Sequence, residues 1–134
     1  NLPELPKLKT MIPNKTIMTT EEIIRTWFEK WEKGKFRELP LSEQFRHTSP
    51  FGTIEGKDAY LELVEHNQDK FLGYEFQIED GIYEENRACV RYIARQGKDF
   101  KLEVSEWYYL ENGNIKKIIA HYHIGEIRQE RMLQ

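Results

Sequence analysis

The sequence lacks several features that would point to a function at once. A single cysteine, Cys89, stands among 134 residues, which excludes an internal disulfide and a cysteine-based metal cage. Its strand-like surroundings predict a small buried hydrophobe. No stretch approaches the ~18 consecutive apolar residues that a membrane-spanning helix needs. The 20 basic and 23 acidic residues are interspersed, which argues against a nucleic-acid surface because such surfaces need clustered lysine and arginine.

The chain also lacks a glycine-rich loop that could hold phosphates, and we expect no cofactor. Its length fits a single domain, which we place at residues 18–134 behind an extended, proline-rich leader at 1–17. The charged end of the chain, 126–134, is expected to add a helical turn or two. No signal peptide is visible, which favours a cytoplasmic protein, although a start at Asn1 rather than Met leaves a processed N-terminus open.

Two helices are predicted in the first half of the chain. Residues 19–22 (Thr-Thr-Glu-Glu) are typical of a capping box, in which a threonine hydroxyl caps the helix and the last glutamate reaches back. The helix ends at Gly34, and its wide apolar face holds Ile23, Ile24, Trp27, Phe28 and Trp31. A second helix runs from about Gly56 to Gly73, and its apolar side holds Ala59, Tyr60, Leu63, Val64, Asn67 and Phe71.

Alternation with a period of two predicts the strands. A short strand over 43–49 places Phe45, His47 and Ser49 on one face, and a turn follows it. Four long strands are predicted in the second half, at 74–84, 87–95, 100–110 and 115–124. Their connectors are short and rich in turn residues, so these strands should form an antiparallel meander.

Helices followed by a long antiparallel meander predict an α+β domain. Strands of this length must twist, so the antiparallel sheet is expected to curve into a cone with the helices on its concave face. Side chains cannot fill such a cone completely. An open cavity between helices and sheet is therefore expected, and cavities of this kind are the usual ligand sites.

Several strings, in this order and spacing, resemble a known superfamily. Residues 27–34 (Trp-Phe-Glu-Lys-Trp-Glu-Lys-Gly), 47–52 (His-Thr-Ser-Pro-Phe-Gly), 54–60 and 111–115 look like segments of nuclear transport factor 2-like domains, especially the SnoaL-like branch. The resemblance covers nearly the whole domain and implies its cone-shaped, cystatin-like fold. It leaves the function open, because this fold hosts isomerases, polyketide cyclases, epoxide hydrolases, dehydratases and non-catalytic binding modules.

The ketosteroid isomerase branch allows a comparison residue by residue. Where that branch has a tyrosine in its oxyanion hole, the resemblance places Trp27, whose indole is a donor only. Where it has an aspartate as base, Ser49 stands, and an unaided serine hydroxyl cannot remove a proton at neutral pH. Glu106 stands at the position of the carboxylic acid, where an apolar pocket could keep it neutral and able to donate a hydrogen bond.

Three residues are candidates for catalysis: His47, Glu106 and Tyr108. The imidazole of His47 titrates near neutral pH, although a structural histidine bonded to a neighbouring strand is an equal alternative. Glu106 and Tyr108 would polarise a carbonyl, unless a slip of register turns Glu106 outward toward Arg91 and Arg95. The expected ligand-binding residues are Trp27, Phe45, Ser49, Val104, Ile118, Ala120 and Tyr122, the last three as implied by the resemblance.

The outer face of the sheet is expected to carry its own aromatic and histidine side chains. The resemblance places His121 and His123 there, and we expect no metal, since only Glu126 lies close enough in sequence to add a third ligand. Trp107 and Tyr109 also face outward by period two. Two exposed aromatic residues favour a homodimer through this face, and coverage by the leader or the tail is the alternative.

The sequence thus predicts a domain that binds a small, mostly apolar molecule in a conical pocket. Three functions stay open. They are a cofactor-independent proton transfer of the cyclase, isomerase, dehydratase or hydrolase type, binding or sensing without chemistry, and a structural dimer whose cavity is incidental. The first gains if His47 and Glu106 both reach the cavity, and the last gains if side chains fill it.

Overall fold

The computed structural model describes residues 17–125. The predicted leader, apart from its last residue, and the predicted helical tail lie outside these residues. The elements follow in the order α1 (Thr20–Glu32), η2 (Phe36–Glu38), β1 (Leu41–Ser49), β2 (Gly52–Glu55), α2 (Lys57–His66), α3 (Gln68–Phe71), β3 (Tyr74–Glu84), β4 (Arg87–Gln96), β5 (Phe100–Glu111) and β6 (Asn114–His121).

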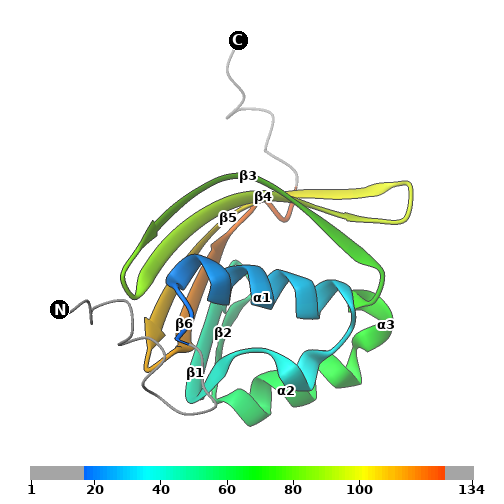
Figure 1. The fold of residues 1–134 in the computed structure, drawn as a ribbon. Coiled ribbons are helices and arrows are strands. Elements are labelled where there is room, and N and C mark those ends of the chain that lie inside the picture. The colour runs from blue at the N-terminus through cyan, green and yellow to red at the C-terminus, as the bar shows by residue number, and fades with distance from the viewer. Residues whose placement is uncertain (1–16, 126–134) are drawn as a thin grey trace, which may run out of the picture.

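One curved sheet of six strands forms the wall of the domain, in the order β2-β1-β6-β5-β4-β3. Its long strands arch over α1, and α2 and α3 lie on the same side of the sheet (Figure 1). The predicted α+β cone is confirmed, with one correction to its topology. The sheet is mixed rather than antiparallel, because β1 enters beside the last strand and pairs with β6 in parallel.

Strand β2 was not predicted, and its short length explains why. Only the turn after Ser49 was expected, but Gly52–Glu55 folds back onto β1 as the second strand of a hairpin. Four residues are too few to show a clear alternation of apolar and polar side chains.

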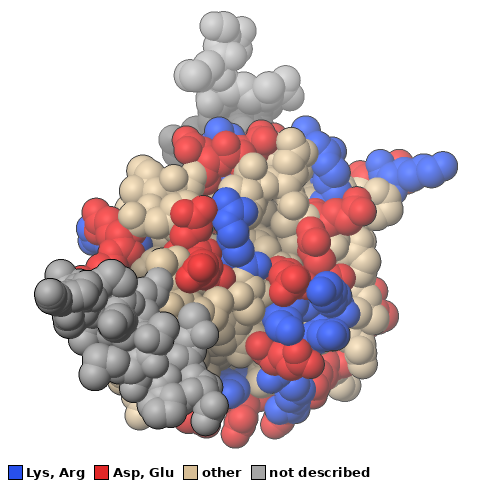
Figure 2. Space-filling view, viewed as in Figure 1, with Lys and Arg blue, Asp and Glu red and all other residues tan. Residues whose placement is uncertain are grey.

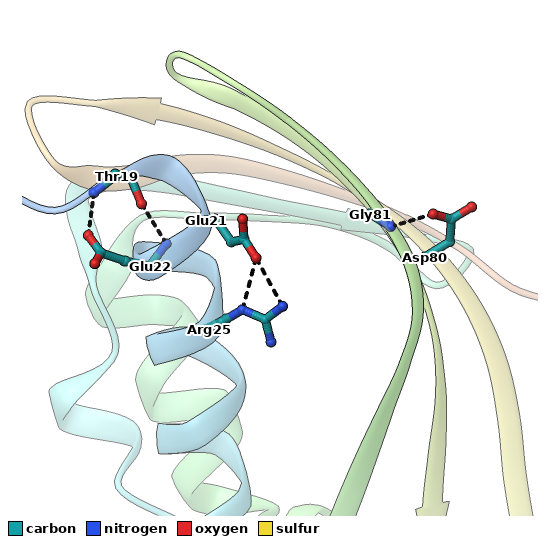
Figure 3. Close-up of polar contacts among 6 residues, drawn as sticks. All are labelled: Thr19, Glu21, Glu22, Arg25, Asp80 and Gly81. Carbon is teal, nitrogen blue, oxygen red and sulfur yellow. Dashed lines mark hydrogen bonds and ion pairs between the residues drawn. The ribbon is translucent and has the colours of Figure 1, made fainter.

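Helix α1 has the predicted capping box and apolar face. The Thr19 hydroxyl accepts a hydrogen bond from the Glu22 N–H at 3.1 Å, and the Glu22 carboxylate accepts one from the Thr19 N–H at 2.8 Å (Figure 3). All five apolar residues predicted for its inner face are buried. Gly34 follows the helix with a φ of +71°, a left-handed conformation that favours glycine.

The predicted second helix is two shorter ones, α2 and α3, separated at Asn67. The side-chain amide of Asn67 donates to the Leu63 carbonyl at 2.8 Å, and asparagine often interrupts helices by such bonds to the backbone. On α2 the expected Tyr60 and Val64 are buried, whereas Leu63 is 44% exposed and the unpredicted Leu61 is buried in its place.

The meander from β3 to β6 has the predicted connections, and its register fixes which residues face inward. Glu106 pairs with Val90 on one side and Ala120 on the other, and all three are buried. The Arg91 alternative for Glu106 is excluded because Arg91 pairs with Ser105, one residue along, and therefore lies on the opposite face.

Charged side chains are mixed on the surface. Lys and Arg lie among Asp and Glu over α1 and its surroundings (Figure 2), as in the pair that joins Arg25 to Glu21 at 3.0 Å (Figure 3). No helix in the described part of the chain is long and apolar enough to cross a membrane.

Candidate functional site

The helices and the concave face of the sheet line a cavity of about 370 Å³ that is partly open to solvent. Aromatic and aliphatic side chains make most of its wall. The lining residues are Trp27, Trp31, His47, Ser49, Phe51, Ile54, Tyr60, Leu63, Val64, Phe71, Tyr74, Phe76, Tyr92, Ala94, Leu102, Val104, Glu106, Ala120 and Tyr122. This lining contains one carboxyl group and one imidazole, and it contains no lysine, arginine or aspartate.

Glu106 is the one charged residue that is buried in the described part of the chain, with 4% of its surface exposed. It comes from β5, and the Tyr108 hydroxyl two residues along donates a hydrogen bond to its Oε1. Burial raises the pKa of Glu106 to about 7, and hydrogen bonds from Tyr108 and Tyr92 offset only part of that rise. Near neutral pH the carboxyl group can therefore either donate or accept a proton.

His47, on β1, lines the same cavity and is half-buried. Its ring lies 5.2 Å from the Tyr60 ring and 6.3 Å from the Phe45 ring, centroid to centroid. Loss of contact with water lowers its pKa to about 4, so the imidazole is neutral at physiological pH. The sequence predicts that His47 titrates near pH 7 and can move a proton in either direction. In this site the pKa of Glu106, and not that of His47, lies near 7.

No side chain in the described part of the chain makes a hydrogen bond to His47. The alternative of a structural histidine bonded to a neighbouring strand therefore finds no support. Both ring nitrogens stay free to meet a ligand. The ring packs against Phe45 and Tyr60, and no carboxylate among the described residues orients it by a hydrogen bond, as one does in many catalytic histidines.

The predicted ligand-binding residues fall into two groups. Trp27, Ser49, Val104, Ala120 and Tyr122 line the cavity as expected. Phe45, Ile118 and the catalytic candidate Tyr108 face the same side of the sheet but are fully buried behind the lining. Alternation along a strand predicts the face that a side chain takes but not its depth, and here aromatic rings from α1 and α2 pack against Phe45 and Tyr108.

Ser49 does line the cavity, but its hydroxyl has a structural task. The Ser49 oxygen accepts a hydrogen bond from the Phe51 N–H at 3.1 Å and so stabilises the turn between β1 and β2. This bond agrees with the argument that Ser49 cannot replace the base of the isomerases.

Sequence reasoning missed several lining residues from other elements. These are Trp31 on α1, Tyr60 on α2, Tyr74 and Phe76 on β3, and Tyr92 on β4. A usable signal existed for the strand residues, because Tyr92 shares its strand parity with the buried Val90 and Ala94, and Tyr74 and Phe76 alternate with exposed polar residues along β3. The helix residues could not be assigned because periodicity places them in the core without saying which of them border a void.

The outer face carries the residues expected there. His121 and His123 are exposed, and within residues 17–125 no three His, Cys, Asp or Glu side chains come together to hold a metal. Trp107 is 38% exposed and Tyr109 is half-buried under the Lys117 ammonium group, 4.5 Å from its ring centroid. Cys89, predicted to be buried, is half-buried here instead, opposite Trp107 in the register of β4 and β5.

Comparison with known proteins fits this geometry. The model of the SnoaL-like domain matches residues 24–118. The chain belongs to the SnoaL-like domain family. No curated protein has a significantly similar sequence.

Solved structures show the same fold as this SnoaL-like domain. An NTF2-like protein of unknown function from Cytophaga hutchinsonii has a TM-score of 0.70 at 22% identity, over 81% of this chain and 94% of that one. A proposed ketosteroid isomerase from Kribbella flavida has a TM-score of 0.67 at 15% identity, over 86% and 88%. A proposed isomerase of the SnoaL-like family from Agrobacterium tumefaciens has a TM-score of 0.62 at 18% identity, over 78% and 97%. At these identities the likeness establishes the fold alone.

Proposed function

We propose that this SnoaL-like domain binds a small, mostly apolar and uncharged molecule in its cavity and transfers a proton on it without a cofactor. Glu106 is the acid and His47 the base of this proposal. The fold relationship with proposed isomerases is consistent with such chemistry but does not establish it.

One observation carries the proposal. Glu106 and His47 line one largely apolar cavity, and burial moves their pKa values in opposite directions, to about 7 and about 4. Near neutral pH the carboxyl group therefore still holds a proton in a large fraction of molecules, while the imidazole holds none. Pairs of titratable groups whose surroundings separate their pKa values are typical of acid–base sites.

In the proposed step a nitrogen of His47 removes a proton from the carbon next to a carbonyl group, and Glu106 gives its proton to the carbonyl oxygen. The C–H electron pair becomes the new C=C bond and the C=O π pair takes up the proton, so the ketone becomes an enol. Return of a proton at the same or another carbon restores both residues. From the two pKa values, charging His47 at the expense of Glu106 costs about 4 kcal/mol before the attraction between the two charges is counted.

Hydrogen exchange on simple ketones tests the proposal without knowledge of the natural substrate. The protein is incubated in D₂O with 2-acetylnaphthalene and 1-tetralone, and mass spectrometry follows deuterium at the carbon beside the carbonyl. We expect exchange above the buffer rate, lowered roughly 100-fold in Glu106→Gln and in His47→Gln. Trp107→Phe, on the outer face, is the matched control and should keep the rate. A ketone that binds but exchanges only at the buffer rate would contradict proton transfer.

Binding or sensing without chemistry is the second candidate. It is favoured by one specific observation: no residue between 17 and 125 makes a hydrogen bond that would hold the His47 ring in a catalytic orientation. Under this alternative the ketones bind in the cavity and none of them exchanges.

We also propose that the domain forms a homodimer through the outer face of the sheet. Ile82, Cys89, Trp107 and Ile119 stand opposite one another on four neighbouring strands and make a continuous apolar row, here called the outer row. Ile82 is 68% exposed and Trp107 is 38% exposed, and a row of this kind is a liability on a monomer. A second copy of the chain would cover it.

A further inference from the structure

Tyr60 is a polar residue of the cavity that the proposed reaction leaves unused. It lies on α2, only 4% of its surface is exposed, and it lines the cavity. Aromatic rings hold it on several sides: its centroid is 5.0 Å from Phe45, 5.2 Å from His47 and 6.4 Å from Trp27. Its hydroxyl nevertheless donates no hydrogen bond to any residue in the described part of the chain, and the polar group beside it is another donor, the indole N–H of Trp31. A phenol this deeply buried normally has a partner, so a ligand oxygen is the natural one.

Trp31 lies next to that hydroxyl and has an unsatisfied group of its own. Its indole N–H is sealed from solvent and has no hydrogen-bond partner among the described residues. Burial and the charge of Glu106 raise the pKa of Tyr60 well above 10, and the Trp31 indole lowers it by a smaller amount. The N–H is thus near the phenolic oxygen without a bond of ordinary geometry. An N–H beside this oxygen favours the rotamer in which the Tyr60 O–H points away from Trp31.

We propose that Tyr60 donates a hydrogen bond to the carbonyl oxygen of the ligand, alongside Glu106, and that Trp31 is the positioning residue that orients the Tyr60 hydroxyl. The inference rests on the proposed function, because it names the polar group by which the bound molecule is recognised. It replaces the role that sequence comparison gave to Trp27 with a donor from a different helix.

The charges in the cavity restrict the ligand further. None of the described lysine or arginine residues lines it, and the His47 ring is neutral at physiological pH. A carboxylate or phosphate would be buried without a positive partner, which costs far more than a hydrogen bond returns. The ligand class is therefore an uncharged ketone, aldehyde or ester with an apolar body.

The two donors differ in their response to pH, which allows them to be separated. Glu106 donates only while it is protonated, so its contribution is present below a pH of about 7 and is lost above it. Tyr60 keeps its proton throughout this range because its pKa lies well above 10. Tyr92 also lines the cavity and keeps its proton, so the signature of Tyr60 is a carbonyl preference that survives at high pH and is lost in Tyr60→Phe.

The test compares 2-acetylnaphthalene with 2-isopropenylnaphthalene, in which a CH₂ group replaces the carbonyl oxygen in the same planar shape. Dissociation constants are measured for both at about pH 5.5 and about pH 9. The carbonyl preference is defined as the dissociation constant of the hydrocarbon divided by that of the ketone. For the wild type at the higher pH we expect a preference of roughly three- to tenfold, the value of one neutral hydrogen bond.

Tyr60→Phe should reduce the preference at the higher pH to about one and leave a preference at the lower pH, where Glu106 still donates. Trp31→Phe should reduce it in part, and the double variant should show no further loss beyond Tyr60→Phe, because Trp31 acts through Tyr60. Tyr109→Phe makes the same chemical change outside the cavity and should keep the wild-type values.

The outcomes separate this inference from the proposed function. If both probes bind and Tyr60→Phe keeps the wild-type preference at the higher pH, Tyr60 is not the donor and the proposed function stands. If the wild type binds neither probe, the proposed function itself fails and this inference fails with it. If the double variant loses more than Tyr60→Phe, Trp31 acts on the ligand by another route and its positioning role is refuted.

Discussion

Between about pH 4 and pH 7, two cavity residues should affect the stability of the fold in opposite directions. Folding raises the pKa of Glu106 from 4.5 to about 7, so the stability from this group is full below pH 4.5 and is lost as the pH rises through 7. Folding lowers the pKa of His47 from 6.5 to about 4, so its stability is full above pH 6.5 and is lost as the pH falls through 4.

Each change spans a similar pKa interval and corresponds to about 3 kcal/mol at 1.4 kcal/mol per pKa unit. In the wild type the two slopes offset each other over the shared range from pH 4.5 to 6.5. In Glu106→Gln only the His47 slope remains, and the free energy of unfolding should rise by about 3 kcal/mol from pH 4 to 6.5. In His47→Gln only the Glu106 slope remains, and the free energy should fall by about 3 kcal/mol from pH 4.5 to 7.

Urea denaturation of the wild type, both variants and the double variant over this pH range measures these slopes. Subtracting the wild-type free energy at each pH removes the contribution of the surface groups, which all four proteins share. The double variant should match the wild type in slope. Differences between each single variant and the wild type that stay constant with pH, within about 1 kcal/mol, would refute the burial of the two groups in their assigned protonation states.

Three further predictions concern the rest of the fold. Trp107→Lys places a charge in the outer row and should halve the mass measured by sedimentation equilibrium, whereas an unchanged mass would refute the proposed dimer face. Gly34→Ala should lower the free energy of unfolding by at least about 1 kcal/mol, because φ is +71° and a Cβ would come within 2.8 Å of Leu72; unchanged urea unfolding would contradict this. Thr19→Ala removes the hydroxyl of the capping box and should cost about 1 kcal/mol in the same assay, whereas Thr19→Ser, which keeps the hydroxyl, is its control.

The elements whose patterns are long could be predicted from the sequence. The capping box at Thr19 and the five inner residues of α1 were predicted because cap chemistry and helical period agree there. Glu106 could be placed inward because its parity matches that of Leu102 and Val104. Strand β2 and the break at Asn67 were missed because both depend on pairing or side-chain bonds that only a few residues specify.

The site was less predictable because it depends on depth and on contacts between distant elements. Strand alternation predicted the correct face for Phe45 and Tyr108, and the family resemblance did so for Ile118, but neither indicated that these residues lie behind the cavity lining. The chemistry of His47 changed with its burial, since a histidine pKa follows its surroundings rather than its sequence. The sequence places Tyr60 on the apolar side of a helix. That its hydroxyl borders the cavity without an acceptor among the described residues follows only from the packing of α2 against the sheet.

The central claim is tested most directly by measuring how an uncharged probe binds to the wild type and to a variant whose cavity is filled by a larger side chain. N-phenyl-1-naphthylamine is uncharged, and 8-anilino-1-naphthalenesulfonate has the same skeleton with a sulfonate. Ala94 lines the cavity between Phe76 and Leu102, so Ala94→Phe should fill it, while Ala59→Phe on the exposed side of α2 is the matched control. We predict that the neutral probe binds the wild type and Ala59→Phe, that Ala94→Phe loses this binding while remaining folded, and that the sulfonate binds far more weakly. Equal binding of the neutral probe to the filled variant would contradict the account.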